Sequence, residues 1–313
     1  MILLVTEETS WMRIDLFLVH SLPGLSRNQA QQALRDGRIF VNGTAALKRV
    51  LLKVGDSVDL RELEPKTPAL HYPTSPPLDV VYEDSDLLVV NKPAGILTHP
   101  ARSADTNTLL DRLVAHCGKN LSNTRGGGMA GIVHRLDKDT SGLLMVAKNN
   151  QTHQLLAKLI EDRKVSKFYL TLLHGKLIPR TGSIEAPLLK AQRNPAQALT
   201  RVSLSPHAKW ALTHYEVLEF IQQQYSFVRV QIVTGRTHQI RAHFSSIGHD
   251  VVGDSAYGSS DRDIGAPRQF LHSSRLVFTH PISGQVLDFE APLPADLEHF
   301  LHQLRFSSSL PQL

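Results

Sequence analysis

The sequence is poor in the residues that build disulfides, zinc clusters and membrane spans. Cys117 is the only cysteine among 313 residues. An internal disulfide and a cysteine-based zinc cluster are therefore excluded, which suits a reducing cytoplasm. No stretch approaches the roughly 18 apolar residues that span a bilayer, and the short apolar start at residues 2–5 lacks the basic region of a signal peptide. We expect a cytoplasmic protein with no membrane partner.

The overall composition is that of a globular, basic protein. Apolar residues make up 42% of the chain and charged residues 20%, values typical of folded domains. The length allows one large domain or two smaller ones. The net charge of +5 and the sequence pI of about 9.3 favour a polyanionic partner.

The first sixty residues have the pattern of a small, basic domain. A helix beginning near Ile14, a second helix capped by Ser26 and a short strand before the Asn42-Gly43 turn are expected. Basic residues outnumber acidic ones in this segment. The basic residues are Arg13, Arg27, Arg35, Arg38, Lys48, Arg49 and Lys53. Their concentration in one small unit predicts a phosphate-binding face.

Three short motifs in this segment resemble a known RNA-binding domain. They are Ser26-Arg27-Asn28-Gln29-Ala30, Gly37-Arg38-Ile39-Phe40-Val41-Asn42-Gly43 and Gly55-Asp56. The pattern is similar to the S-four domain, first named for a ribosomal small-subunit protein. This resemblance implies a small α/β RNA-binding domain at residues 1–61, in which Arg27 and Arg38 contact RNA.

A proline-rich segment follows this domain. Five prolines between residues 62 and 78 disfavour helix and central strand, so we expect an extended linker there. A second domain is then expected at residues 79–313. Alternating apolar residues predict a hairpin at 79–91 and a strand at 167–175, with Tyr169 on one face.

A polar loop at residues 131–144 is the first candidate site in this second domain. Apolar segments flank it, glycines bound it, and it carries Arg135 and Asp137 two positions apart. Loops held between strands are favoured places for chemistry. The same composition is also that of an ordinary surface turn.

A second candidate site begins at Gly235. Apolar spacing predicts a helix with Thr237 as its N-cap, and this places Arg236, His238 and Arg241 near an anion-favouring helix start. Three nearby histidines, at positions 238, 243 and 249, lack the four-residue spacing that aligns two metal ligands on a helix. We therefore expect no metal site.

The motifs of the second domain, taken together and in order, resemble those of one enzyme family. The sequence is similar to RluA-type pseudouridine synthases, which isomerise uridine in RNA. The matching segments are Lys92-Pro93-Ala94-Gly95, His134-Arg135-Leu136-Asp137-Lys138-Asp139-Thr140-Ser141-Gly142, Lys167 to Gly175, Gly235-Arg236-Thr237-His238-Gln239-Ile240-Arg241-Ala242-His243, Gly253-Asp254, Tyr257-Gly258 and Leu271-His272. The resemblance implies an α+β protein whose catalytic domain has a mixed, mainly antiparallel sheet flanked by helices.

The resemblance also implies a role for individual side chains. Asp137 is expected to be the catalytic carboxylate, and Tyr169 to stack on the uracil. An ionised carboxylate in a closed pocket needs a partner, for which we favour Arg241 over Arg236. The remaining expectations concern RNA contacts: Arg135 fills the space left by a flipped base, Arg236 binds RNA, and Leu271 lines the pocket.

The expected activity is therefore the isomerisation of specific uridines in large-subunit ribosomal RNA, by base flipping and an aspartate-dependent break and re-formation of the glycosidic bond. It requires no cofactor and no metal, and we expect a monomer that binds structured RNA. Attack at the sugar, addition to the base and a glycal route stay open. Two alternatives are a haloacid-dehalogenase-type phosphatase, suggested by Asp137-Lys138-Asp139-Thr140, and an RNA chaperone that only binds.

Overall fold

The structure is a computed structural model that describes most of the chain. The described residues are 1–22, 25, 27–47, 50–60, 77–100, 106–118, 120–122, 124, 129–190, 199–258 and 264–306. Ser26, Lys48, Arg49, the Arg27 side chain and the expected linker through residue 76 lie outside these ranges. The expected domain boundaries therefore stay predictions.

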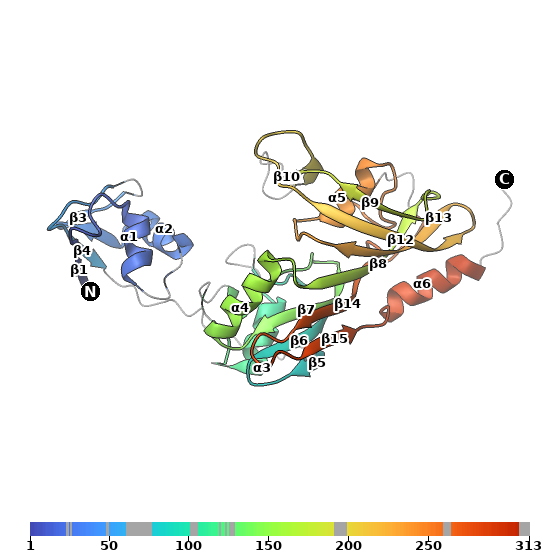
Figure 1. Ribbon diagram of the computed structural model, residues 1–313, viewed down its shortest axis with the longest axis horizontal. Coiled ribbons are helices and arrows are strands. Elements are labelled where there is room, and N and C mark those ends of the chain that lie inside the picture. The colour runs from blue at the N-terminus through green and yellow to red at the C-terminus, as the bar shows by residue number, and fades with distance from the viewer. Residues whose placement is uncertain are drawn as a thin grey trace.

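The N-terminal residues form two helices and a four-stranded antiparallel sheet of order β1-β4-β2-β3 (Figure 1). The elements are β1 (Ile2–Leu4), α1 (Ile14–Ser21), α2 (Arg27–Arg35), β2 (Ile39–Val41), β3 (Thr44–Ala45) and β4 (Ser57–Leu60). Ile14, Phe17 and Leu18 share one face of α1 and are buried in the core of this unit. Asn42 and Gly43 both have positive φ, which allows the two-residue turn between β2 and β3.

A nine-stranded sheet organises the rest of the described chain. Its order is β5-β6-β7-β14-β8-β13-β12-β9, with β15 paired to β14. The strands are β5 (Val80–Glu83), β6 (Leu87–Lys92), β7 (Ser141–Ala147), β8 (Ser166–His174), β9 (Thr181–Glu185), β12 (Leu212–Ile221), β13 (Tyr225–Ile232), β14 (Leu271–Thr279) and β15 (Val286–Glu290). Only β7 and β14 pair in parallel in this described sheet. The expected mixed, mainly antiparallel sheet is confirmed.

Helices cover both faces of this sheet because its strands are apolar on both sides. The helices are α3 (Leu109–Cys117), α4 (Asn150–Glu161), α5 (Gln239–Ser246) and α6 (Ala295–Phe306). In β6, Leu88 and Val90 belong to the same core cluster as α3 and α5, whereas Leu87 and Val89 belong to the cluster of α4. α6 packs on a further cluster. A separate hairpin is formed by β10 (Leu188–Lys190) and β11 (Thr200–Val202).

The parallel contact between β7 and β14 depends on a glycine. Gly142 lies opposite Ser273 and has a φ of 113°, a backbone conformation that other residues rarely adopt. A side chain at Gly142 would overlap the backbone of Ser273. Because β7 and β14 run in the same direction, the loop before β7 and the start of β14 lie at the same edge of the sheet.

The start of α5 differs from the expectation. His238, not Thr237, is the N-cap, with φ 53° and no capping hydrogen bond from its side chain. The Gln239 side chain folds back instead, and its carbonyl oxygen accepts from the Arg236 N–H and the Thr234 hydroxyl. This local bonding replaces the cap that Thr237 was expected to provide.

Candidate active site

Segments that are distant in sequence meet where the loop before β7 and the start of β14 lie side by side. The 131–140 loop leads into β7, and Leu271 begins the neighbouring strand β14. On the other side of β14, Tyr169 of β8 lies opposite Ser273. The start of α5 completes the group, because α5 packs on the same face of the sheet as Tyr169.

These segments enclose a pocket of about 270 Å³. The pocket is lined by six of the residues that the sequence predicted for the site. They are Arg135, Asp137, Tyr169, Arg236, Arg241 and Leu271. The fold thus brings together in one cavity residues that lie as far apart in sequence as positions 135 and 271.

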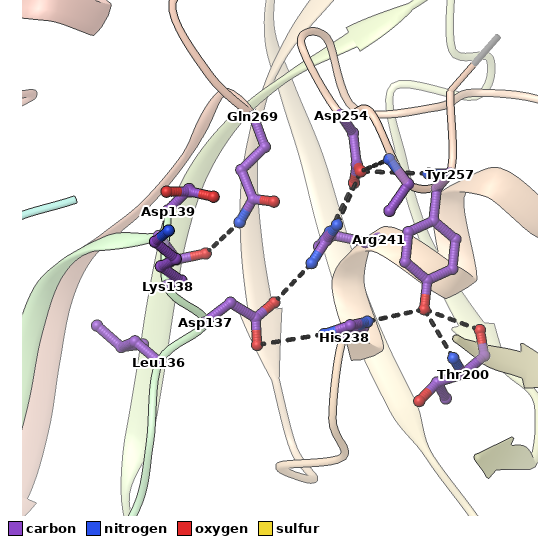
Figure 2. Close-up of polar contacts among 12 residues, drawn as sticks. Leu136, Asp137, Lys138, Asp139, Thr200, His238, Arg241, Asp254, Tyr257 and Gln269 are labelled. Atoms are coloured by element: carbon purple, nitrogen blue, oxygen red, sulfur yellow. Dashed lines mark hydrogen bonds and ion pairs between the residues drawn. The ribbon is translucent and has the colours of Figure 1, made fainter. Parts of the chain in front are cut away.

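Asp137 and Arg241 form an ion pair in this pocket (Figure 2). Nη1 of Arg241 donates to Oδ2 of Asp137 at 3.0 Å. The rest of the guanidinium is held by Asp254, with distances of 2.6 Å from Nε to Oδ2 and 2.8 Å from Nη2 to Oδ1. The partner that the sequence favoured for Asp137 is therefore the one in contact with it. Because Asp254 and Asp137 both bind the Arg241 guanidinium, its orientation is fixed, and it in turn orients the Asp137 carboxylate.

The surroundings keep Arg241 charged although its side chain is 8% exposed. Burial acts to lower the pKa of Arg241, but the hydrogen bonds and charges of Asp254 and Asp137 outweigh burial and raise the pKa. The guanidinium carbon also lies 5.0 Å from the centre of the Tyr257 ring, a cation–π distance. A permanently charged partner lowers the free-energy cost of an ionised carboxylate inside the pocket.

Tyr169 and Leu271 form an apolar part of the pocket wall. Tyr169 is 5% exposed and Leu271 is 4% exposed. Burial raises the pKa of the Tyr169 phenol, against a hydrogen bond with Ser273 that lowers it. The phenol is therefore uncharged at neutral pH, and its ring offers a flat apolar surface to a ligand.

The two other arginines of the pocket are exposed, unlike Arg241. Arg236 turns its Nε to the Trp210 carbonyl at 3.1 Å, so its described contact is not with Asp137. Arg135 extends from the same loop as Asp137. Both guanidinium groups lie where a polyanion outside the pocket can reach them.

In the N-terminal domain, the structure describes one of the two expected RNA-binding arginines. Nη2 of Arg38 donates to Asp36 at 2.6 Å, and the Arg38 side chain is 27% exposed. The Arg27 backbone belongs to α2, but its side chain lies outside the described structure.

Comparison with known proteins assigns the chain to a family. Residues 86–246 match the family described as RNA pseudouridylate synthase, and residues 12–58 match the S4 domain. The chain is 42% identical over 301 residues to the protein "Uncharacterized RNA pseudouridine synthase YlyB" of Bacillus subtilis, and the match covers 96% of each chain. The chain belongs to the RNA pseudouridine synthase family.

Further relatives agree with this assignment. "Ribosomal large subunit pseudouridine synthase D" of Zymomonas mobilis is 37% identical, with 97% of each chain covered. The solved structure titled "Human RNA Pseudouridylate Synthase Domain Containing 1" is 27% identical, with a TM-score of 0.57 over 74% of this chain and 95% of that one. The chain is thus an RNA pseudouridine synthase, an isomerase, with an N-terminal S4 domain. The phosphatase alternative is wrong.

The 131–140 loop, which carries Asp137, is held in place by side chains that the sequence did not single out individually. Lys92 is 0% exposed, and its Nζ donates to the carbonyls of Pro93, Ile96 and Lys138 at 2.9–3.1 Å. Nη1 of Arg268 donates to the Asp139 carbonyl at 2.9 Å. A buried lysine bound to three carbonyls ties the hairpin end to the loop. Lys92 lies in the motif Lys92-Pro93-Ala94-Gly95, whose residue types alone do not reveal these contacts.

A second buried lysine lies inside the pocket itself. Lys167 is 5% exposed, and burial lowers its pKa to about 8. Its Nζ lies beside Gly235, 3.6 Å from where a side chain would begin. In the described part of the chain, no carboxylate pairs with it. The ammonium is a positive charge available to an anionic or carbonyl group that enters the pocket.

The three histidines that raised the question of a metal make separate contacts. His243 bonds Thr213 and the Ala186 carbonyl, and His249 bonds the His174 carbonyl. His238 faces the pocket, with its Nε2 3.8 Å from Oδ1 of Asp137. Among the described residues, the groupings that could hold a metal ion lie elsewhere and contain no pocket residue: Glu83, His116 and Cys117, and Asp84, Asp86 and His280.

Proposed function

We propose that this enzyme converts specific uridines of large-subunit ribosomal RNA to pseudouridine. A relative named as a ribosomal large subunit pseudouridine synthase matches almost the full chain, and an S4 domain precedes the catalytic residues. The net charge of +5 suits a large polyanionic substrate. We expect the protein to act as a cytoplasmic monomer without cofactor or metal.

The observation that carries the catalytic proposal is the ion pair of Asp137 with Arg241. The carboxylate is 17% exposed, so it is withdrawn from bulk water but lines the pocket. Because Asp254 already holds the guanidinium, the pair is organised before substrate arrives. Asp137 is then suited to act at C1′ of the ribose, either as a nucleophile or by stabilising positive charge there.

The surrounding residues support base flipping. A uridine in structured RNA must leave its stack to reach a pocket of this kind, at a cost of a few kcal/mol. In our proposal the Tyr169 ring stacks on the extruded uracil, and Leu271 lines the space beside it. Arg135 is exposed on the Asp137 loop and fills the space that the base leaves, while Arg236 and the N-terminal Arg27 and Arg38 bind RNA.

The test is direct conversion of ribosomal RNA by purified protein. Wild type is expected to form pseudouridine without added metal or nucleotide, at positions that are unmodified in RNA from cells lacking the protein. Asp137→Asn should lower kcat by at least about 10³-fold, because the charge acting at C1′ is lost, while RNA affinity changes little. Liquid chromatography of nucleosides and filter binding measure the two quantities.

Asp139→Asn is the matched control, since it changes the same residue type in the same loop. Asp139 holds its loop position through its backbone carbonyl, which Arg268 binds, so this variant should keep most of the activity. An active Asp137→Asn enzyme would overturn the catalytic proposal and favour a role in RNA binding alone. Conversion of transfer RNA but not ribosomal RNA would overturn the substrate proposal.

A further inference from the structure

His238 occupies an unusual backbone position at the pocket wall. Its φ of 53° is left-handed, a conformation that few residues other than glycine adopt. That backbone directs the imidazole between two other side chains (Figure 2). Nε2 lies 3.8 Å from Oδ1 of Asp137, and Nδ1 lies 3.1 Å from the Tyr257 hydroxyl. The oxygen of Asp137 that Arg241 does not bind is thus the one nearest to His238.

The contacts of Tyr257 determine which nitrogen of His238 carries the proton. The Tyr257 hydroxyl donates its single hydrogen to the Thr200 carbonyl at 2.9 Å and accepts from the Thr200 N–H at 2.9 Å. Toward His238 it therefore offers only a lone pair. The hydrogen bond then requires a proton on Nδ1 of His238. In the neutral ring, Nε2 keeps its lone pair, and this nitrogen is the one nearest to Asp137.

Burial, more than the neighbouring charges, favours the neutral ring of His238. Burial lowers the pKa of His238, and the charges of Arg241 and Arg135 lower it further. Asp137 and Asp254 act in the opposite direction, but the net shift is downward. The Nε2 lone pair is therefore available at neutral pH.

The isomerisation needs a group that accepts a proton close to Asp137. When C5 of uracil bonds to C1′, C5 must release its proton, and the electron pair of the C5–H bond returns to the ring. N1, freed from the sugar, carries a proton in the product. Because C5 is then bonded to C1′, where Asp137 is proposed to act, the acceptor must lie within a few ångströms of the carboxylate, as the reach of a general base requires.

Other titratable side chains that line the described pocket are poor acceptors. The arginines keep their protons. Burial raises the pKa of Tyr169, so its phenol also keeps its proton. Nε2 of His134 already accepts the Met145 N–H at 2.9 Å. Lys167 also lines the pocket, but burial lowers its pKa only to about 8, so its ammonium keeps its proton at neutral pH. Besides Asp137 itself, His238 is therefore left as a base at the right place.

We propose that Nε2 of His238 accepts the C5 proton during the formation of pseudouridine. The imidazolium that forms lies beside the Asp137 carboxylate, which stabilises the new charge. The inference rests on the proposed role of Asp137 at C1′. It makes His238 a catalytic residue that acts in the last part of the reaction, after the glycosidic bond has broken.

His238→Asn is the decisive variant. Asparagine tolerates the left-handed backbone, and its amide can donate to Tyr257, but it has no basic lone pair. RNA affinity should stay within twofold of wild type, while kcat falls by about 10²-fold or more, the usual contribution of a general base. RNA carrying deuterium at C5 of the target uridine should react more slowly than normal RNA, and this isotope effect should be larger in the variant than in wild type.

Fluorinated RNA separates His238 from Asp137. In 5-fluorouridine no proton is left on C5, so the reaction can proceed to the new carbon–carbon bond without a base for that step. His238→Asn should form the rearranged fluorinated nucleoside at a rate within a few-fold of wild type. Asp137→Asn should not form it. If Asp137→Asn formed it, the proposed role of Asp137 would fail, and that failure is distinct from failure of the proposal for His238.

Chemical rescue and pH dependence complete the test. Glycine also suits a φ of 53°, so His238→Gly should regain activity when imidazole is added. Wild-type kcat should fall on acidification as His238 becomes protonated, with a midpoint below the ordinary histidine pKa of about 6.5. The pH profile of His238→Asn should lack this fall in kcat. Full activity of His238→Asn, or a loss without a larger C5 isotope effect and without imidazole rescue, would overturn the proposal.

Discussion

The Arg38 ion pair of the N-terminal domain and the Arg241 ion pairs of the catalytic pocket use charged side chains in opposite ways. Arg38 pairs with Asp36, two residues away, and the side chains are 27% and 38% exposed. Arg241 pairs with Asp137, which is 104 residues away, and with the fully buried Asp254. Exposed pairs contribute little to stability, whereas a buried charge that loses its partner is costly. The first arrangement costs little to break, and the second holds one carboxylate in one orientation.

The largest effect should follow from breaking the buried pair at Asp254. Asp254→Ala leaves the Arg241 guanidinium without its main partner, which should lower the free energy of unfolding of the catalytic domain by about 3–5 kcal/mol. It should also lower kcat, because Asp137 loses an oriented partner. Urea unfolding and pseudouridine assays measure the two effects.

Asp288→Ala is the control for this substitution. Asp288 pairs with Arg275 at 2.6 Å, but the two side chains are 42% and 44% exposed. No measurable change in unfolding or activity is expected. An equal loss of stability in both variants would contradict the distinction between buried and exposed pairs.

An intermediate effect is expected at Lys167, whose burial lowers its pKa from 10.5 to about 8. The unfolded chain binds the proton more tightly than the folded one, so the stability of the fold rises with pH between about 8 and 10.5. Lys167→Met should stabilise the catalytic domain by roughly 3 kcal/mol below pH 8, and this gain should shrink as pH rises through that window. Unfolding at several pH values measures it, and activity should fall because the pocket loses its ammonium.

Lys92→Met provides the contrast, because burial lowers the pKa of Lys92 further, to about 7, yet its Nζ donates to three carbonyls. Removing its ammonium leaves those buried acceptors without a donor, which costs stability. This variant should therefore be less stable than wild type at neutral pH. If Lys167→Met were also less stable than wild type at neutral pH, the Lys167 ammonium would have to make a stabilising contact in the folded protein, which would contradict this prediction.

The smallest effect is expected on the exposed N-terminal pair. The hydrogen bonds from Gln32 and Arg38 hold the pKa of Asp36 below its ordinary value, so Asp36 is charged at neutral pH and neutralises Arg38. Asp36→Asn should free Arg38 for RNA, steepening the slope of log K against log salt by about 0.7–0.9 for one added phosphate contact. Filter binding at several salt concentrations measures this slope.

Arg38→Ala is the matched opposite change. It should flatten the same slope, while pseudouridine formation at saturating RNA stays unchanged, because Arg38 is proposed only to bind RNA. If both substitutions left the slope unaltered, Arg38 would not face the RNA.

Local pattern predicted the secondary structure well and the helix ends less well. The hairpin expected at residues 79–91 is formed by β5 and β6, because alternating apolar residues define a strand with two faces. The N-cap of α5 was misplaced at Thr237, because Gln239 folds back on Arg236 and Thr234. β1 was not predicted either; Ile2–Leu4 is a strand because it pairs with β4, a contact that no local pattern reveals.

The sequence by itself determined the family, the order of its motifs and the favoured partner of Asp137, because these depend on residue types at fixed positions. The tertiary structure decided what surrounds that pair. Asp254 grips Arg241, Lys167 enters the pocket without a carboxylate partner among the described residues, and His238 turns Nε2 toward Asp137. Asp254 and Arg241 are 13 residues apart, whereas His238 and Asp137 come from distant segments of the chain. All of these features depend on burial and strand register, which arise only when the whole sheet has formed.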